Sequence, residues 1–265
     1  MMPLMTYRTD YHIHTTFSDG KSPAADYIGP ALSAGLSEIG FSEHLSLFRE
    51  KQEWCMNPSN VKSYIEYISS LKEQFPDIKI KTGLEIDYIP GSEKELELFL
   101  ADLDLDYRIG SVHYFGDKTV DLNPDFYYGK DFNILFEGYF DIVMAAASSG
   151  LFDIIGHCDL IRIFGYKPEF DPEDLYRNLA RSFKKNDVVF ELNTNGRNRP
   201  LADFYPDRRF LHIFAEEKVP VCINSDAHLP ARVGQYFDEA YALLKAAGFT
   251  ETATFTKRQR RMIRF

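Results

Sequence analysis

The stretch Asp10–Gly20, which reads DYHIHTTFSDG, holds two histidines separated by one residue, with an aspartate on either side of them. A strand places residues i, i+2 and i+4 on one face, so Asp10, His12 and His14 are expected to project together. Imidazole and carboxylate groups are ordinary ligands of a divalent metal ion. A hydrogen-bonded polar core is the alternative for this pair of histidines taken alone, and the rest of the chain has to decide between the two.

The other candidate ligands are Asp19, five residues after His14, and residues at or near the ends of other short apolar runs. The latter are His44, Glu85, His113, His157, Asp226 and His228. Of the seven histidines only His212 lies elsewhere, in DRRFLHIFAEE, a segment that predicts a helix. Each histidine taken singly is more often a hydrogen-bonded structural residue than a ligand. Gathered at one place without a metal they would form a costly cluster of unpaired polar groups, so together they favour a site for several ions.

Short apolar runs alternate with longer helical patterns along the chain. Strands are predicted near residues 8–14, 37–42, 78–86, 107–112, 153–157, 187–193 and 219–225. Helices are predicted over residues 58–75, 131–149, 171–186 and 235–247, and over 23–35 with a kink at Gly29-Pro30. This order of elements is typical of a parallel sheet.

A parallel sheet of this size is either open and doubly wound or closed into a barrel. No GxGxxG or Walker sequence follows the first predicted strand, which disfavours an open nucleotide-binding sheet. A barrel also accounts for the polar residues, because barrel enzymes carry their chemistry at the C-terminal ends of the strands. The sequence therefore predicts an α/β fold, a (β/α)7 TIM-like barrel that forms a single domain over residues 1–265.

Composition narrows the class of protein. The chain has 265 residues, of which 45% are hydrophobic and 26% charged, as in ordinary soluble globular proteins. The net charge of −10 disfavours nucleic acid as a partner. Three scattered cysteines without CxxC spacing predict reduced thiols in a cytoplasmic protein. The N-terminal MMPLMTYRTD predicts no signal peptide, and the longest apolar stretch, interrupted by aspartates, predicts no membrane span. The oligomeric state is left open.

Three arginines follow the fifth and sixth predicted strands. Arg162 stands in HCDLIRIFG, and Arg197 and Arg199 stand in ELNTNGRNRP. A guanidinium group can hold two phosphate oxygens at once, although for any single arginine a surface salt bridge is the alternative. Their position on adjacent loops of the active face favours Arg162 and Arg197 as phosphate ligands. Arg208 and the basic tail TKRQRRMIRF are interpreted as solvated charge, and the tail could instead close the bottom of the barrel or contact a partner.

The ordered blocks DYHIHT…SDG, GFSEH, GLEIDY, SVHY, GHCD and NSDAH resemble the polymerase and histidinol phosphatase (PHP) superfamily over almost the whole chain. The length, the lack of a fused polymerase and the segment ELNTNGRNRP resemble the histidinol-phosphatase type within it. The resemblance implies a distorted seven-stranded barrel that holds three divalent metal ions, with zinc, iron and manganese as the candidates.

The resemblance also implies how the ligands divide among the ions. The first ion would be held by His12, His14, Glu85 and Asp226. The second would be held by Asp19, His44 and His228. The third would share Glu85 as a bridge and add His113 and His157. Asp19 stands where many superfamily members have histidine, and the carboxylate resembles the histidinol phosphatases. Arg162 and Arg197 resemble the arginines that bind phosphate in those enzymes.

The function implied is hydrolysis of L-histidinol phosphate to L-histidinol and phosphate, a step of histidine biosynthesis with a small-molecule substrate. Metal ions can supply hydroxide near neutral pH and neutralise the leaving oxygen. Asp226, His228, Arg162 and Arg197 are the candidate catalytic residues. Two alternatives stay open: a PHP-type enzyme that acts on a nucleotide or on phosphotyrosine, and a metal-binding module without catalysis.

Overall fold

The computed structural model describes residues 7–47 and 52–265, and at its centre is a sheet of seven strands in the order β1-β2-β3-β4-β7-β8-β9. The strands are β1 (Thr9–Asp10), β2 (Glu38–Leu45), β3 (Lys79–Asp87), β4 (Tyr107–Ser111), β7 (Ile154–Ile155), β8 (Val189–Asn193) and β9 (Val221–Asn224). Every neighbouring pair is parallel. A parallel bridge between Ile13 and Ala227 joins the two edges, so the sheet closes and the predicted seven-stranded barrel is confirmed.

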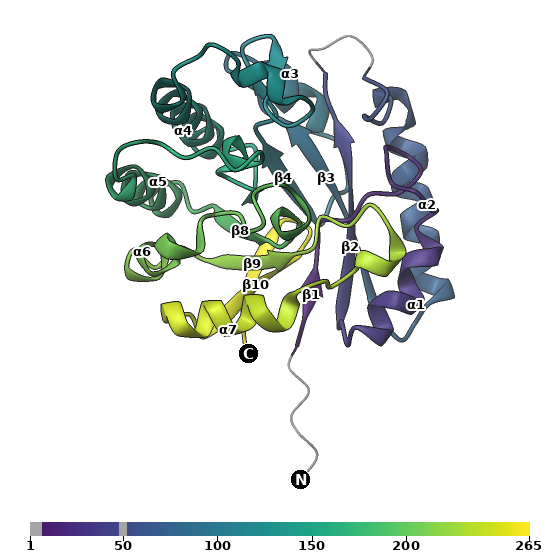
Figure 1. Ribbon diagram of the computed structural model, residues 1–265. Coiled ribbons are helices and arrows are strands. Elements are labelled where there is room, and N and C mark those ends of the chain that lie inside the picture. Colours follow the sequence, from purple (N-terminus) through teal and green to yellow (C-terminus); the bar gives the residue numbers. More distant parts are fainter. Residues whose placement is uncertain (1–6, 48–51) are drawn as a thin grey trace.

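Helices surround the barrel on its outside (Figure 1). They are α1 (Ala25–Ser33), α2 (Val61–Gln74), α3 (Glu93–Leu100), α4 (Phe132–Ser148), α5 (Glu173–Lys185), α6 (Leu211–Glu216) and α7 (Phe237–Ala247). The predicted helices are all present, and Pro30 lies inside α1. The helix α3 was not predicted. Within the described part of the chain, no helix combines the length and the apolar character that crossing a bilayer requires. The prediction of no signal peptide rests on MMPLMTYRTD, and residues 1–6 of this segment lie outside the described residues.

The helix α5 illustrates why these segments are helical. Its buried side chains recur at helical spacing, at Tyr176, Leu179, Ala180 and Phe183. Acidic residues occupy its first turn and lysines its last turn, where each sign of charge interacts favourably with the helix dipole. The apolar stripe contacts α4 and the barrel, while the charged face is left to solvent.

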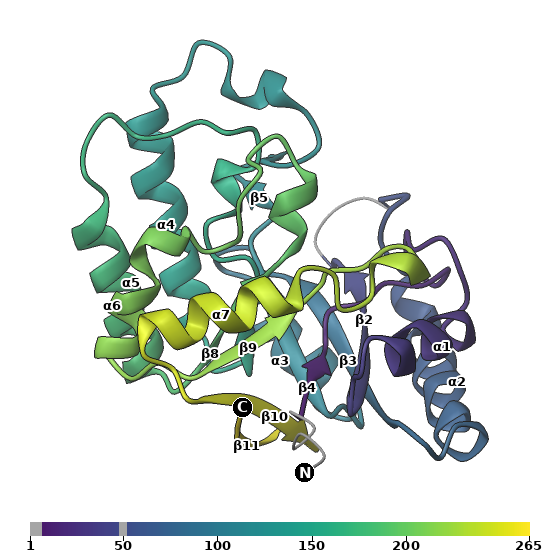
Figure 2. The same cartoon turned by 60° about the horizontal axis from the view of Figure 1, so that its bottom comes forward.

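The C-terminal hairpin closes the bottom of the barrel (Figure 2). It consists of β10 (Glu251–Thr256) and β11 (Gln259–Arg264). The ring of Phe255 lies 6.1 Å from the ring of Tyr11 and 6.3 Å from that of Tyr107, inside the barrel. A Cβ on Gly83 would lie 2.3 Å from the Tyr107 ring, so this strand position needs glycine. The basic tail pairs with β10 as the outer strand of this hairpin and keeps its charged side chains exposed or half-buried, and the opposite end of the barrel is left for chemistry.

Candidate metal centre

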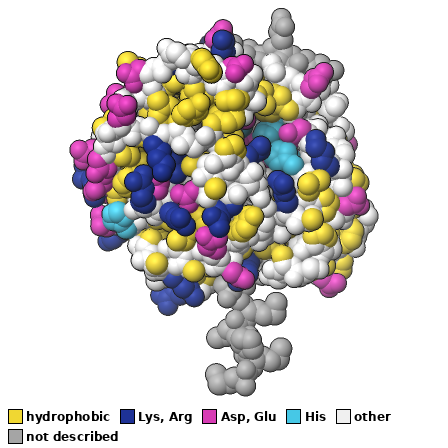
Figure 3. All heavy atoms as spheres, in the orientation of Figure 1, with side chains coloured by type: hydrophobic (Ala, Val, Ile, Leu, Met, Phe, Trp, Pro, Cys, Tyr) yellow, Lys and Arg dark blue, Asp and Glu magenta, His cyan; other side chains and the backbone are white. Residues whose placement is uncertain are grey.

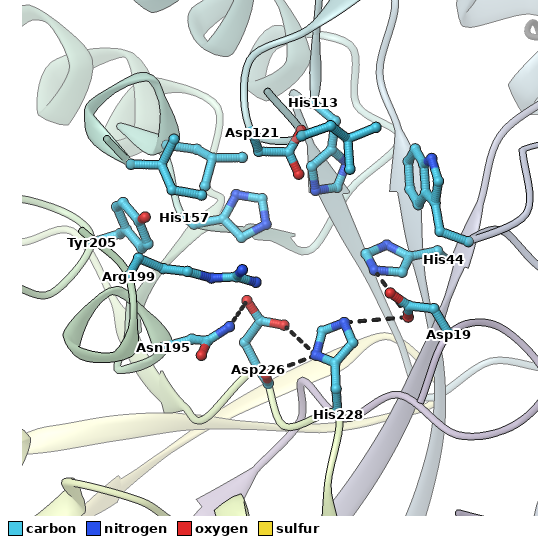
Figure 4. Close-up of a pocket in the computed structure, with 14 residues that line it drawn as sticks. Asp19, His44, His113, Asp121, His157, Asn195, Arg199, Tyr205, Asp226 and His228 are labelled. Carbon is cyan, nitrogen blue, oxygen red and sulfur yellow. Dashed lines mark hydrogen bonds and ion pairs between the residues drawn. The ribbon is translucent and has the colours of Figure 1, made fainter. Parts of the chain in front are cut away.

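The predicted ligands converge at the C-terminal ends of the barrel strands, around one pocket (Figure 4). Their ligand atoms fall into overlapping groups within which all the atoms lie within 4.8 Å of one another. The groups together contain every candidate ligand named from the sequence: His12, His14, Asp19, His44, Glu85, His113, His157, Asp226 and His228. Residues separated by more than 200 positions therefore meet because parallel strands end at the same rim.

Two histidines and two carboxylates lie close together, and three of these residues, His12, His14 and Asp226, form one of the groups. Nε2 of His12 lies 3.2 Å from Glu85 Oε2 and 3.9 Å from Asp226 Oδ1. Nε2 of His14 lies 3.5 Å and 3.4 Å from the same two oxygens. Four ligands bound at about 2.1 Å in a tetrahedral arrangement are about 3.4 Å apart. These separations therefore suit one ion at the centre of the group.

The second group lies nearer to the surface. Asp19 Oδ1 is 3.2 Å from Nε2 of His228 and 3.7 Å from Nε2 of His44. The loop that carries Asp19 folds back on the first strand through Gly20, where a Cβ would lie only 2.1 Å from the carbonyl oxygen of His14. Glycine at this position therefore allows the carboxylate of Asp19 to reach the two histidines.

Glu85 stands between the groups. Its Oε1 lies 2.9 Å from Nε2 of His157 and 3.6 Å from Nε2 of His113. Its Oε2 faces His12, His14 and Nδ1 of His44, the last at 2.6 Å. One carboxylate with different imidazoles on its two oxygens has the geometry of a bridging ligand.

Buried ligand atoms in this centre lack hydrogen-bond partners. They include Nε2 of His12, both ring nitrogens of His14, Oδ1 of Asp19 and Oε2 of Glu85. A buried polar atom without a hydrogen bond costs about 1–3 kcal/mol. The cost disappears when a divalent cation takes the place of the missing donors, so the residues present fit metal ions.

The electrostatics of the centre favour cations. The pKa values of Asp226, Glu85 and Asp19 are all lowered, because the surrounding histidines outweigh the opposing effect of burial. Burial, together with His44 and His228, lowers the pKa of His14 to about 3, which leaves its imidazole neutral and able to bind a metal. Burial opposes protonation of His12 too, but Glu191, Glu85 and Asp226 raise its pKa well above the usual value. The carboxylates thus favour a positive charge beside His12, whether a proton or a metal ion supplies it.

Two ligands have an unusual backbone conformation. The φ angles are 20° for His157 and 50° for Asp226, in a region that residues other than glycine rarely adopt. Such strain persists only where the surroundings impose it, and it concentrates at functional sites. Asp10, expected on the same face as His12, is bound instead through backbone amides, because its oxygens accept from Ser225 N at 2.9 Å and Gly234 N at 3.1 Å.

Two further carboxylates, Glu191 and Asp87, orient two of the histidines, and neither was among the predicted site residues. Nδ1 of His12 lies 2.6 Å from Oε1 of Glu191, and Nδ1 of His113 lies 2.7 Å from Oδ1 of Asp87. A proton held on Nδ1 leaves the lone pair of Nε2 facing Glu85, as metal binding requires. The signal in the sequence was an acid in an otherwise apolar strand, in VVFELN for Glu191 and two residues after Glu85 for Asp87.

Glu191→Gln should weaken metal binding at His12. Glu191 accepts from Asn224 Nδ2 at 2.8 Å, from the backbone N of His157 at 2.8 Å and from Asn193 Nδ2 at 2.9 Å, besides its contact with His12. In glutamine an NH2 group would replace one of the two carboxylate oxygens, and it would face N–H donors that need an acceptor. We expect a loss of about 10- to 100-fold in metal affinity, measured by competition with a chelator.

The matched control is Glu173→Gln, which removes the same charge from an exposed ion pair with Arg177 on α5. An exposed pair contributes little, so this variant should bind metal as the unmodified chain does. Equal metal affinity in Glu191→Gln and Glu173→Gln would show that Glu191 does not orient His12.

Two of the predicted arginines contact protein groups outside the pocket in this structure. Arg162 is buried in an ion-pair cluster, with Nη1 2.6 Å from Asp159 Oδ2 and Nη2 3.4 Å from Asp207 Oδ2. Asp159 is fully buried and therefore needs a counter-charge, which Arg162 provides. Nη1 of Arg197 donates to the carbonyl of Ala202 at 3.0 Å, and Nη2 lies 3.4 Å from Glu239. Neither arginine lines the pocket.

Arg199 lines the pocket in their place. Its side chain has no hydrogen bond or ion pair with any residue that the structure describes, and Figure 4 shows it reaching into the pocket near Asn195 and Asp226. The pocket has a volume of about 250 Å³, and Trp54, Asp121 and Tyr205 also line it. Figure 3 shows histidine side chains in a hollow of the surface with basic side chains beside it. His212 lies outside the pocket, exposed on α6.

The sequence of this chain is similar to a known family and to several described proteins. A family model described as "PHP domain" matches residues 10–195. A protein of Deinococcus radiodurans described as "Probable histidinol-phosphatase" is 36% identical over 262 residues, which cover 96% of this chain and 99% of the other. A histidinol-phosphatase of Lactococcus lactis subsp. lactis is 27% identical over 261 residues, which cover 94% of this chain and 94% of the other.

Solved structures agree with these sequence matches. The crystal structure of histidinol phosphate phosphatase from Lactococcus lactis subsp. lactis, complexed with zinc, L-histidinol and phosphate, has a TM-score of 0.84 and 25% sequence identity. The alignment covers 97% of this chain and 99% of that chain.

Proposed function

The chain belongs to the PHP family, and we propose that it is a metal-dependent phosphomonoesterase that hydrolyses L-histidinol phosphate to L-histidinol and phosphate. The observation that carries the proposal is the convergence of imidazoles and carboxylates in overlapping groups about Glu85, at the mouth of the barrel. The solved relative that contains zinc, L-histidinol and phosphate supports the same substrate. Hydrolysis of this ester is a step of histidine biosynthesis, and on that basis we propose a cytoplasmic location.

We further propose three divalent ions, with zinc, iron and manganese as candidates. The first would be held by His12, His14, Glu85 and Asp226. The second would be held by Asp19, His44 and His228. The third would be held by Glu85, His113 and His157. When bound, such ions supply hydroxide near neutral pH and offset the charge of phosphoryl oxygens.

The residues of the chain prepare the pocket for a phosphate ester. Nδ2 of Asn193 and Nδ2 of Asn195 each lie 3.3 Å from Oδ2 of Asp226, which fixes the carboxylate and leaves Oδ1 facing His14. Nδ1 of His228 lies 3.1 Å from the carbonyl oxygen of Asp226, and its Nε2 faces Asp19. Both side chains are thereby held at the pocket, with Nε2 of His228 free to bind a metal ion beside Asp19.

Arg199 is the proposed phosphate ligand of the chain, in place of Arg162 and Arg197. A guanidinium without a protein partner can donate two parallel hydrogen bonds to phosphoryl oxygens. The net charge of −10 disfavours nucleic acid, and a pocket of about 250 Å³ suits a small ester.

The proposal is tested by measuring turnover of L-histidinol phosphate beside AMP and a phosphotyrosine peptide, with the same metal-loaded protein. We expect kcat/KM to be highest by far for L-histidinol phosphate. A preference for AMP or for the peptide would assign the site to a different phosphoester. Absence of turnover with all three substrates in metal-loaded protein would indicate a metal-binding module.

A further inference from the structure

Asp121 is a pocket carboxylate with no role in the proposed metal centre. Three carboxylates line the pocket, those of Asp19, Asp121 and Asp226, and of these only Asp121 is absent from the ligand groups. Its Oδ1 is buried, and among the described residues its side chain has no hydrogen bond and no ion pair within 4 Å, although its charge helps to raise the pKa of the neighbouring His113. A buried carboxylate oxygen without a donor is costly, so a group that enters the pocket is the expected partner.

The backbone around Asp121 is held in place. The amide of Val120 donates to the carbonyl of His113 at 2.9 Å, and the hydroxyl of Tyr127 donates to the carbonyl of Val120 at 2.8 Å. Val120 itself is fully buried. Asp121 is therefore anchored between β6 (Lys118–Thr119) and the short helix η2 (Pro124–Tyr127), and Figure 4 shows its carboxylate at the pocket beside His113.

Opposite charges are separated across the pocket. Figure 4 shows Arg199 on the side of Asn195 and Asp226, and Asp121 on the side of His113. A substrate with an anionic and a cationic end can satisfy both. In L-histidinol phosphate the protonated amine is on the carbon next to the one that carries the ester oxygen, so the amine lies near the reacting group.

Resting on the proposed function, we infer that Asp121 binds the protonated amine of the substrate and so selects phosphomonoesters that carry a cationic group beside the ester. An ammonium group donates charge-assisted hydrogen bonds to a carboxylate, and these are stronger than bonds between neutral groups. Asp121 is thus a specificity-determining residue, and the chemistry at phosphorus does not depend on it.

The test compares two substrates in two variants. L-histidinol phosphate carries the amine, whereas imidazolylpropyl phosphate keeps the imidazole and the phosphate and lacks the amine. Asp121→Asn should lower kcat/KM for L-histidinol phosphate about 10- to 100-fold, as expected for loss of a hydrogen bond to a charged group. It should change kcat/KM for imidazolylpropyl phosphate by less than about threefold, because there is no amine to lose. Asp117→Asn, which removes an exposed carboxylate from the neighbouring turn, should change neither value.

Equal losses on both substrates would overturn the inference, because a structural role does not distinguish them. If the unmodified chain does not hydrolyse L-histidinol phosphate, the proposed function is wrong. The role of Asp121 is then tested separately, by measuring the affinity of the chain for L-histidinol. Trp54 is the only tryptophan of the chain and lines the same pocket, so its fluorescence reports this binding. Asp121→Asn should weaken binding of L-histidinol about tenfold or more, and an unchanged affinity would overturn the inference.

Discussion

Glu85→Gln should lose more bound metal than any other single replacement in the centre, and its turnover of L-histidinol phosphate should fall by about 10³-fold or more. The reason is that the two oxygens of Glu85 face different imidazoles, His157 on Oε1 and His12 and His44 on Oε2. Glutamine has the same shape but lacks the charge and presents an amide donor on one side, so both of the ions that we propose to share Glu85 would lose a ligand. Metal content per chain and kcat are the measurements.

The control for Glu85→Gln is His212→Gln, a replacement on the exposed surface of α6. It should leave metal content and kcat close to those of the unmodified chain. Circular dichroism should show that both variants are folded. A folded Glu85→Gln variant with full metal content would contradict the bridging role, and a His212→Gln variant as damaged as Glu85→Gln would contradict the placement of the centre.

Arg199→Ala should lower kcat/KM for L-histidinol phosphate by about 30- to 1,000-fold while metal content stays unchanged. The pocket lining includes the guanidinium of Arg199, which has no partner among the described residues. Arg199→Lys should recover only part of the loss, because lysine offers a point charge in place of a planar fork. Steady-state kinetics with metal-loaded protein provide the measurement.

Arg197→Ala is the matched control, since Arg197 lies two residues earlier in the same loop. Its guanidinium donates to the carbonyl of Ala202 and pairs with Glu239. The effect of Arg197→Ala on kcat/KM should be small. Equal losses of kcat/KM in Arg197→Ala and Arg199→Ala would contradict the specific role of Arg199. They would show that any arginine of this loop contributes to the same extent. Arg162→Ala is a poor test, because it would leave the buried carboxylate of Asp159 without its counter-charge.

The barrel and its ligands could be predicted because they depend on periodicity and on strand ends. Parallel strands carry their C-terminal residues to one rim, so a histidine after each strand is enough to place the centre without knowledge of distances. His12, His113 and His157 are each placed in this way. The alternation of strand and helix was clear because the helices have apolar stripes at regular spacing, as α5 does.

The elements that were missed have ambiguous local patterns. In α3 the letters EKELELFL alternate between acid and leucine, as a strand would, whereas only Leu96 and Leu100, one helical turn apart, are buried. The β10–β11 hairpin was not predicted either: the charged residues of β11 are exposed or half-buried, as the solvated interpretation of the tail expected, whereas Ala253 and Phe255 of β10 lie inside the barrel. In both cases tertiary burial of a few side chains decided the structure.

Side-chain direction is the other property that the sequence did not reveal. Arg162, Arg197 and Arg199 all follow strands at the active rim, and their order along the chain does not show which of them faces the pocket. The direction of Arg162 was decided by Asp159, Asp203 and Asp207, which come together only in the folded chain. Glu191 was missed for a similar reason, because its role depends on contact with His12 across the barrel.

The most direct test of the metal centre is the turnover of L-histidinol phosphate as a function of metal equivalents bound per chain. Protein freed of metal by a chelator would be reloaded stepwise with zinc or manganese, and bound metal and kcat would be measured on each sample. We expect no turnover without metal and a rise that continues beyond one equivalent per chain, because separate groups of ligands must be filled. Full turnover at one equivalent or fewer, or undiminished turnover in the metal-free protein, would contradict this expectation.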